Sequence, residues 1–105
     1  MHDNFDVEPE VLKAKLTAET AKIDWASLQR FYASGVLVLV HGSLDLIDVA
    51  YAFAVDDKSQ VGPWIQQQHV ERVSDDIATQ WATSQPDLWA VVVSPWVLVQ
   101  LPKQH

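Results

Sequence analysis

The sequence has 105 residues, of which 49% are hydrophobic and 20% are charged. This length and composition suit one compact domain and exclude an intrinsically disordered chain. Fourteen Asp and Glu residues against seven Lys and Arg residues give a net charge of −7, and the basic residues are scattered along the chain. Nucleic acids and anionic lipids are bound mainly through clustered Lys and Arg, so we expect no nucleic-acid binding and no membrane binding.

The sequence also points to a cellular compartment. It contains no cysteine, which excludes disulfides, thiolate metal ligands and a cysteine nucleophile. The first six residues are acidic and lack the basic and apolar regions of a signal peptide. The longest apolar runs, 36–40 and 88–93, are much shorter than a membrane-spanning helix. These features predict an acidic cytoplasmic protein.

The first third of the chain predicts two helices and a strand. Residues 9–22 are rich in helix formers. Asp24 is a residue type favoured at a helix N-cap, and apolar residues follow it at helical spacing until Gly35, which is typical of a helix end. The run 36–40 is short and rich in β-branched residues, so we expect a buried strand there.

The middle of the chain predicts further helices and a short strand. Ser43 is expected to cap a helix with acidic residues in its first turns. The pair Gly62-Pro63 would kink or restart a helix over 44–68, and the sequence leaves its continuity open. Residues 70–73 alternate as an edge strand does, and Ser74 is expected to cap another amphipathic helix.

Residues 88–101 have the composition of β-strand throughout. Ser94-Pro95 does not supply the positive φ angles of a two-residue hairpin turn. The segment is therefore either two strands joined by a wider turn or one strand bent at a bulge. The pattern predicts a single α+β domain over residues 1–105, a few-stranded sheet packed by four to five helices, with 1–8 and 102–105 as loosely ordered ends.

A set of tryptophan, acidic and apolar positions resembles a known family. The positions are Trp25, Leu44-Asp45-Leu46, Asp56-Asp57, Val61, Trp64, Trp81 and Pro95-Trp96-Val97-Leu98-Val99-Gln100. With them, residues 15–101 resemble a small uncharacterised bacterial family catalogued as a domain of unknown function, the 2288 type. The resemblance implies a single soluble domain and carries over no activity, substrate or catalytic residue.

One turn is a candidate ligand site. His41-Gly42-Ser43 lies between a predicted strand and a predicted helix N-terminus, where exposed backbone N–H groups can hold an anion. The side chains of His41 and Ser43 would be additional donors. Asp45 and Asp48 would compete for the same positive helix end. A turn glycine beside a capping serine is the simpler interpretation of this segment.

Known catalytic and metal-binding patterns are absent from the sequence. The three glycines have neither dinucleotide-binding nor P-loop spacing, and no serine lies in a G-x-S-x-G motif. No two histidines are spaced i, i+4, and no calcium-binding loop is present. We therefore expect no catalytic residue, no metal and no cofactor. Gln100, within an apolar strand, is expected to bond backbone groups at the end of the sheet.

The five tryptophans divide into two groups. Trp25, Trp64 and Trp81 lie on apolar helical stripes, which predicts core packing. Trp89 and Trp96 are seven residues apart, so they face opposite sides of a regular strand unless the turn between them shifts the register.

The predicted strands carry no polar face, and covering both faces is demanding for a domain of this size. We therefore expect a homodimer whose interface includes Trp89, Trp96, Val97 and Val99.

Two functions are compatible with these features. The sequence favours a non-catalytic protein-interaction or regulatory module that binds itself or another protein. The alternative is a small-molecule-binding protein or small enzyme with a pocket near His41, Asp45 and Asp48.

Overall fold

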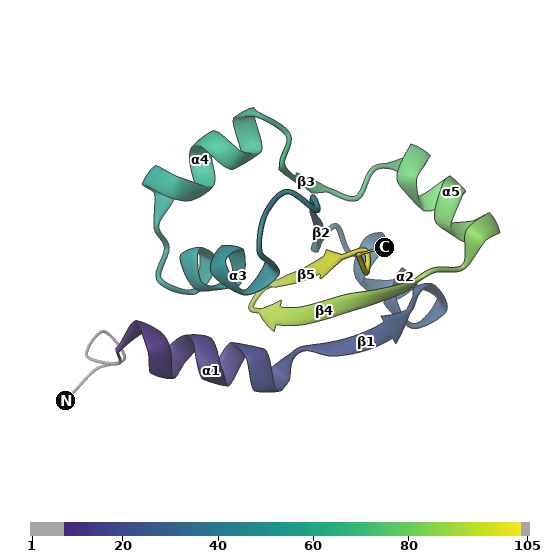
Figure 1. The fold of residues 1–105 in the computed structure, drawn as a ribbon. Coiled ribbons are helices and arrows are strands. Elements are labelled where there is room, and N and C mark those ends of the chain that lie inside the picture. The colour runs from purple at the N-terminus through teal and green to yellow at the C-terminus, as the bar shows by residue number, and fades with distance from the viewer. Residues whose placement is uncertain (1–7, 104–105) are drawn as a thin grey trace.

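The computed structural model describes residues 8–103. Over this range the chain forms five α-helices and one five-stranded sheet (Figure 1), which confirms the predicted α+β class. In chain order the elements are α1 (Pro9–Glu19), β1 (Ala21–Asp24), α2 (Trp25–Ala33), β2 (Leu37–Val40), α3 (Leu46–Ala54), α4 (Lys58–Gln66), β3 (Val70–Arg72), α5 (Asp75–Ser84), β4 (Asp87–Val93) and β5 (Trp96–Gln100). The expected loose ends at 1–8 and 102–105 fall largely on residues 1–7 and 104–105, which lie outside the described range.

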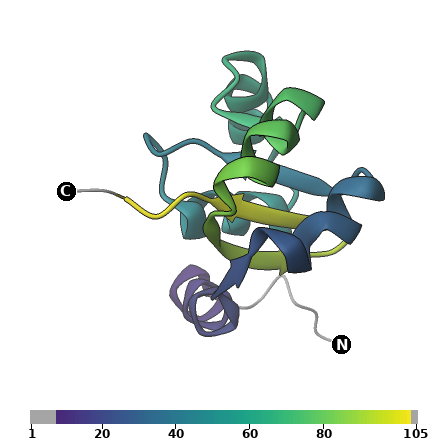
Figure 2. The same cartoon turned by 90° about the vertical axis from the view of Figure 1, so that its right-hand side faces the viewer.

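The sheet has the strand order β1-β4-β5-β2-β3. Its neighbouring strands are antiparallel except for β2 and β5, which run parallel. Helices lie on both faces of the sheet (Figure 2): α1, α3 and α4 on one, which we call the α1–α3 face, and α2 and α5 on the other, the α2–α5 face. In the described part of the chain, no helix is long and apolar enough to cross a membrane.

Strand β2 shows why both faces need cover. Leu37 and Leu39 belong to the hydrophobic cluster on the α2–α5 face, whereas Val38 and Val40 belong to the cluster on the α1–α3 face. All four residues are buried. The strand therefore has no polar face, as its sequence predicts, and helices of the same chain cover both sides of it.

The predicted helix over 9–22 was wrong in its last turn. Helix α1 ends at Glu19, and the next four residues form the edge strand β1. Here Ala21 pairs with Ala90 and Asp24 with Asp87. Pairing with a distant strand thus overrides a local sequence that favours helix.

The boundaries of α2 agree with the sequence. Asp24 is its N-cap residue, in an extended conformation. At the other end Gly35 has a φ of 77°. The N–H groups of Gly35 and Val36 donate to the carbonyls of Tyr32 and Phe31, which is the Schellman arrangement that favours glycine.

The start of α3 differs from the prediction. Ser43 does not cap the helix, because Asp45 is the N-cap residue. The carboxylate oxygen Oδ1 of Asp45 accepts hydrogen bonds from the backbone N–H groups of Ile47 and Asp48, at 2.9 and 3.1 Å. Asp and Ser are similarly good caps, so residue type alone did not distinguish the two positions.

Residues 44–68 contain two helices, but the break lies at 55–57 and not at Gly62-Pro63. Pro63 lies inside α4. The exposed surface position of this short helix leaves water free to satisfy the carbonyl that loses its partner to proline. Side-chain donors of Ser59 and Gln60 bond the Asp57 carboxylate at the start of α4 and lower its pKa.

Strands β4 and β5 form a hairpin, so the first of the two alternatives is confirmed, but its turn is tighter than expected. Val93 pairs with Trp96, which leaves only Ser94-Pro95 in the connection. The Ser94–Pro95 peptide bond is cis, as in a type VI turn, which needs no positive φ. Trp89 and Val93 are four residues apart on β4, so their side chains face the same side of the sheet. Trp96 lies across from Val93 and therefore faces that side too.

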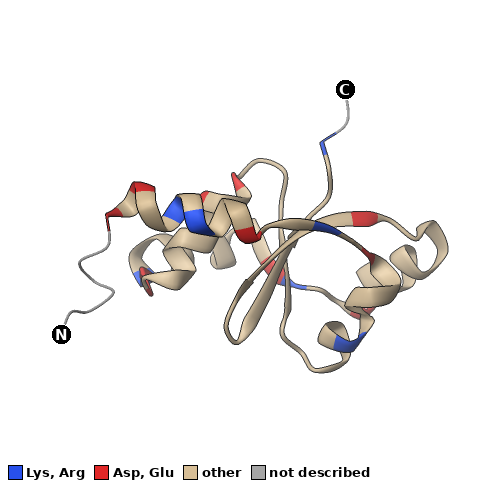
Figure 3. Cartoon of the chain, turned by 90° about the horizontal axis from the view of Figure 1, so that it is seen from below, with Lys and Arg blue, Asp and Glu red and all other residues tan. Residues whose placement is uncertain are grey.

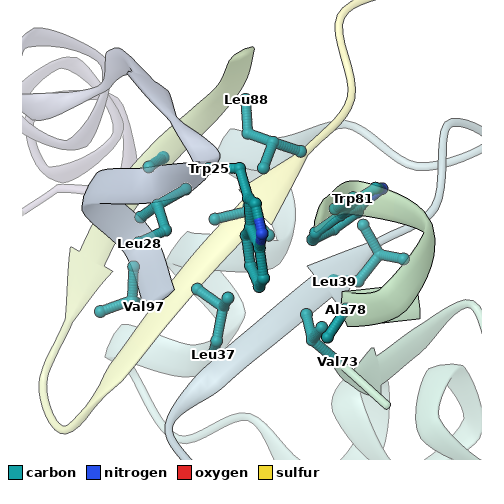
Figure 4. Packing of buried hydrophobic residues seen from close by; sticks show 11 residues of the cluster. Trp25, Leu28, Leu37, Leu39, Val73, Ala78, Trp81, Leu88 and Val97 are labelled. Atoms are coloured by element: carbon teal, nitrogen blue, oxygen red, sulfur yellow. The ribbon is translucent and has the colours of Figure 1, made fainter. Parts of the chain in front are cut away.

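Trp25 and Trp81 join α2 to α5 (Figure 4). Their ring centroids are 5.3 Å apart and their planes are inclined by 70°, an edge-to-face contact. Trp25 is only 2% exposed, and its Nε1 has no hydrogen-bond partner among the described residues. The contribution of Trp25 to stability therefore comes from the burial and packing of its ring.

This packing yields a stability prediction. Trp25→Ala should lower the free energy of unfolding by about 3–5 kcal/mol, because it leaves a large cavity. Trp25→Phe should cost only about 1 kcal/mol, because it keeps an aromatic ring and removes an unpaired buried donor. Urea unfolding followed by circular dichroism measures both values. Equal losses for the two variants would contradict the prediction.

Candidate functional site

The predicted turn His41-Gly42-Ser43 lies at the carboxyl end of β2, beside the end of the parallel strand β5. Gln100, the last residue of β5, is 7% exposed. Its Nε2 donates to the backbone carbonyls of His41 and Leu44, at 3.0 and 2.8 Å. The prediction that Gln100 bonds backbone groups at the end of the sheet is confirmed. The side chain ties the β2–α3 loop to the sheet.

The structure does not bring His41, Asp45 and Asp48 together in one pocket. His41 Nε2 lies 2.6 Å from Glu71 Oε2 on β3. The carboxylate of Asp45 accepts from the first amides of α3, and Asp48 lies 3.1 Å from the Nζ of Lys13 on α1. Each of the three side chains has a different partner, so they do not converge on a ligand.

The predicted anion site at this turn is also filled from within the chain. Gly42 and Ser43 are exposed. The Asp45 carboxylate bonds the α3 amides that an anion would need. A cavity of about 270 Å³ lies beside the loop and includes Asp45 and Gln100 in its lining, but not His41.

The four predicted interface residues fall into two groups. Trp89 is exposed, with the Nζ of Lys22 4.9 Å from its ring centroid, and Trp96 is half-buried. Val97 and Val99 are 4% and 0% exposed, in the cluster beneath α2 and α5. Helices of the same chain cover both valines almost completely, so little of either side chain is left for a partner to contact.

An exposed apolar surface lies next to those valines. Val92 of β4 is 58% exposed, whereas Val91 beside it is buried. It lies in a hollow of about 260 Å³ where β1, β4 and α2 meet. We call this surface the β1 hollow; its lining residues are Glu19, Ala21, Ile23, Ser27, Leu28, Arg30, Phe31, Ala90, Val92 and Val97.

A second apolar surface lies on the opposite face, beneath α4. Two cavities of about 270 and 390 Å³ share Phe53, Ile65 and Trp96 in their linings. We call the two together the α4 groove. The sequence gives no sign of this groove, because the apolar spacing of Val61, Trp64 and Ile65 predicts a packed helix face, yet α4 buries none of its own residues.

A third groove, of about 690 Å³, runs between α2 and α5 and is bridged by a hydrogen bond from the Tyr32 hydroxyl to the Asp75 carboxylate. This bond raises the pKa of Tyr32, and partial desolvation and the negative charge of Asp75 act in the same direction. The groove is thus held by a contact that depends on the protonated tyrosine.

Charges of both signs are interspersed over the described residues (Figure 3). Within residues 8–103, no group of three or more His, Asp or Glu side chains is placed to hold a metal ion.

The comparison with known proteins identifies the family. The family model described as "Protein of unknown function (DUF2288)" matches residues 11–101. The chain belongs to the DUF2288 family. The resemblance predicted from the tryptophan and acidic positions is therefore confirmed.

A solved structure is also similar over nearly the whole chain. The NMR solution structure of PA1075 from Pseudomonas aeruginosa is 41% identical, covers 99% of this chain and 94% of its own, and has a TM-score of 0.79. A bacterial protein thus shares this α+β fold. No curated protein matches the chain.

The role of Gln100 is open to a direct test. Gln100→Glu keeps the size of the side chain but places a carboxylate beside two carbonyls that need a donor. We expect the free energy of unfolding at pH 7 to fall by about 2–4 kcal/mol. Part of the loss should be recovered as the pH falls, because the protonated carboxyl group can donate again.

The matched control is Gln80→Glu, since Gln80 is exposed on α5. It should change stability by less than about 0.5 kcal/mol. Urea unfolding at pH 7 and pH 5 measures both variants. A Gln100→Glu variant as stable as the control at pH 7 would show that the loop does not depend on this donor.

The Tyr32–Asp75 bond predicts a pH effect. A hydroxyl whose pKa is raised above 10.0 on folding contributes stability that is complete below that pH and is lost as the pH rises through the folded-state value. Tyr32→Phe should therefore weaken the decline of stability at alkaline pH relative to the parent protein. Thermal unfolding at a series of pH values from 8 to 11 compares the two, and identical profiles for the variant and the parent would refute the assignment.

Proposed function

We propose that this chain is a cytoplasmic, non-catalytic protein-interaction module that acts as a homodimer, with the β1 hollow at the interface. The observation that supports it is the 58% exposure of Val92 in a strand whose neighbouring side chains are largely buried. Exposed apolar surfaces that are bordered by polar residues often mark interfaces.

The position of the hollow favours a partner that also contacts the sheet edge. Strand β1 is the outermost strand on this side, so its outer backbone groups are not paired within the sheet. Ala21 and Ile23 of that strand line the hollow. A partner seated against Val92 would therefore reach the open edge as well, where unpaired strands commonly associate.

The charges around the hollow favour a second copy of the chain. Two copies each carrying −7 repel one another, so their interface needs local charge compensation. The hollow is bordered by one acid, Glu19, and one base, Arg30, whose guanidinium lies 4.7 Å from the Phe31 ring centroid. In a two-fold contact, Arg30 of each copy can meet Glu19 of the other.

The alternative function, small-molecule binding or catalysis near His41, Asp45 and Asp48, lacks comparable support. Their side chains are engaged separately by Glu71, the α3 amides and Lys13. Nothing in this arrangement positions an acid, a base or a nucleophile against a shared ligand.

The proposed homodimer is tested by measuring the molecular mass of the protein in solution. Light scattering on a size-exclusion column should give about twice 11.8 kDa at tens of micromolar. Val92→Lys should shift the chain to the monomer, because the charge would be buried unpaired in the interface. The side chain is exposed in the single chain, so the variant should remain folded by circular dichroism.

The control is Val11→Lys, at a valine of α1 that is also exposed and lies away from the hollow. It should leave the dimer intact. Arg30→Glu should weaken the dimer and Glu19→Arg in the same chain should restore it. A monomeric parent protein, or equal behaviour of the two lysine variants, would overturn the proposed interface.

A further inference from the structure

The walls of the α4 groove are apolar and come from both layers of the fold. Phe53 of α3, Ile65 of α4 and Trp96 of β5 line its whole length. The buried residues Val38 and Val70 form its floor at one end. Ile65 is 52% exposed, so the groove offers water an apolar surface that a ligand would cover.

Helix α4 lies over this groove without filling it. The helix packs on α3 and β3, and Figure 1 shows it standing away from the centre of the sheet. Its apolar residues Val61 and Ile65 face the cavities but are not buried in them. The space beneath α4 is therefore bounded on two sides by apolar side chains and is open to small molecules.

One end of the groove carries a cation. Arg72 follows Val70 by two residues on β3, so both side chains lie on the α1–α3 face of the sheet. The guanidinium carbon of Arg72 lies 5.3 Å from the ring centroid of Trp96, which positions the charge at the groove. Glu71 also lines this cavity, but its carboxylate is bound by His41, and Arg72 has no ion pair within residues 8–103.

The other end of the groove carries charges that offset each other. There Lys58 Nζ lies 4.0 Å from the Asp56 carboxylate, and both residues line the second cavity. Each end of the groove thus holds one acidic and one basic residue, but Arg72 has no ion pair among the described residues, so its guanidinium is free to bind an anion. An arginine fork matches a carboxylate in two parallel hydrogen bonds.

We propose that the α4 groove binds a small amphiphilic monocarboxylate, with its apolar part between Phe53, Ile65 and Trp96 and its carboxylate on Arg72. One cavity is slightly below the range of about 300–1,000 Å³ for ligand sites and the other is at its small end, which favours a short chain or a single ring. The site is on the opposite face of the sheet from the β1 hollow, so it does not depend on the homodimer.

The probes that test this are octanoate and 1-octanol, which share a chain and differ in charge. In a titration followed by ¹H–¹⁵N NMR, both should shift the indole N–H of Trp96 and the amide of Ile65. Octanoate should bind at least threefold more tightly than octanol. Arg72→Gln should lower the octanoate affinity about three- to fivefold and leave the octanol affinity unchanged.

The matched control is Lys15→Gln, since Lys15 is also an exposed base but lines neither the α4 groove nor the β1 hollow. It should leave both affinities unchanged. Ile65→Trp, which fills the groove from an exposed position, should abolish binding of both probes while the chain stays folded.

Three results would overturn the proposal. The first is no shift at Trp96 with several millimolar of either probe. The second is an octanoate affinity equal to that of octanol and unchanged by Arg72→Gln. The third is an equal loss of octanoate affinity in the Lys15 and Arg72 variants, which would indicate diffuse attraction of an anion. Light scattering separates these outcomes from a failure of the dimer, because the groove variants should leave the mass unchanged.

Discussion

The central strands of the sheet are apolar on both faces, and the need to cover those faces determines where the other elements lie. Leu98 of β5 faces α3, while Val97 and Val99 on either side of it face α2 and α5. The chain therefore needs helices on both sides of one sheet within about 100 residues, where surface is large relative to volume. Five short helices provide this cover over most of the sheet, and the β1 hollow and the α4 groove are two places where the cover is incomplete.

The free energy lost by leaving one apolar side chain exposed is small, but the loss is significant when several exposed side chains form one surface. Burial of a valine side chain stabilises a fold by roughly 1.5–3 kcal/mol, so Val92 at 58% exposure forgoes about half of that. In a monomer the loss is permanent, whereas a symmetric contact recovers it in both copies. The α4 groove shows the same incomplete burial, since Ile65 remains about half exposed whereas Val38 and Val70, which line the same cavity, are buried. Covering the apolar side chains of the β1 hollow or of the α4 groove would therefore be favourable in free energy.

The sequence predicted most of the fold because local signals and tertiary packing agree over most of the chain. The Gly35 stop, the Ser74 cap and the buried run before His41 are local features, and each agrees with the structure. Strand β1 was missed because its residues extend a helix-forming segment, and only its pairing with Asp87–Ala90 makes it a strand. The hairpin turn was unexpectedly tight because no local pattern specifies a cis Ser94–Pro95 bond.

The candidate sites were harder to predict from the sequence than the fold was, because their geometry depends on tertiary structure. His41, Asp45 and Asp48 are close in sequence, but their directions are set by partners on β3, α3 and α1. Gln100 was predictable because a polar residue in an apolar strand must find backbone partners. The β1 hollow and the α4 groove had no such signal, because their apolar residues look like core residues in the sequence. Only the arrangement of the helices shows that they are left open.

The β4–β5 hairpin contributes residues to both the β1 hollow and the α4 groove, but on opposite faces of the sheet. Consecutive residues of a strand point to opposite faces, so Trp96 lines the α4 groove while Val97 borders the β1 hollow. The same alternation separates Val93 from Val92 on the facing strand. A second copy at the hollow and a small acid in the groove would therefore contact different faces of one two-stranded element. The α4 groove and the β1 hollow have no lining residue in common, so each site can be occupied while the other is filled.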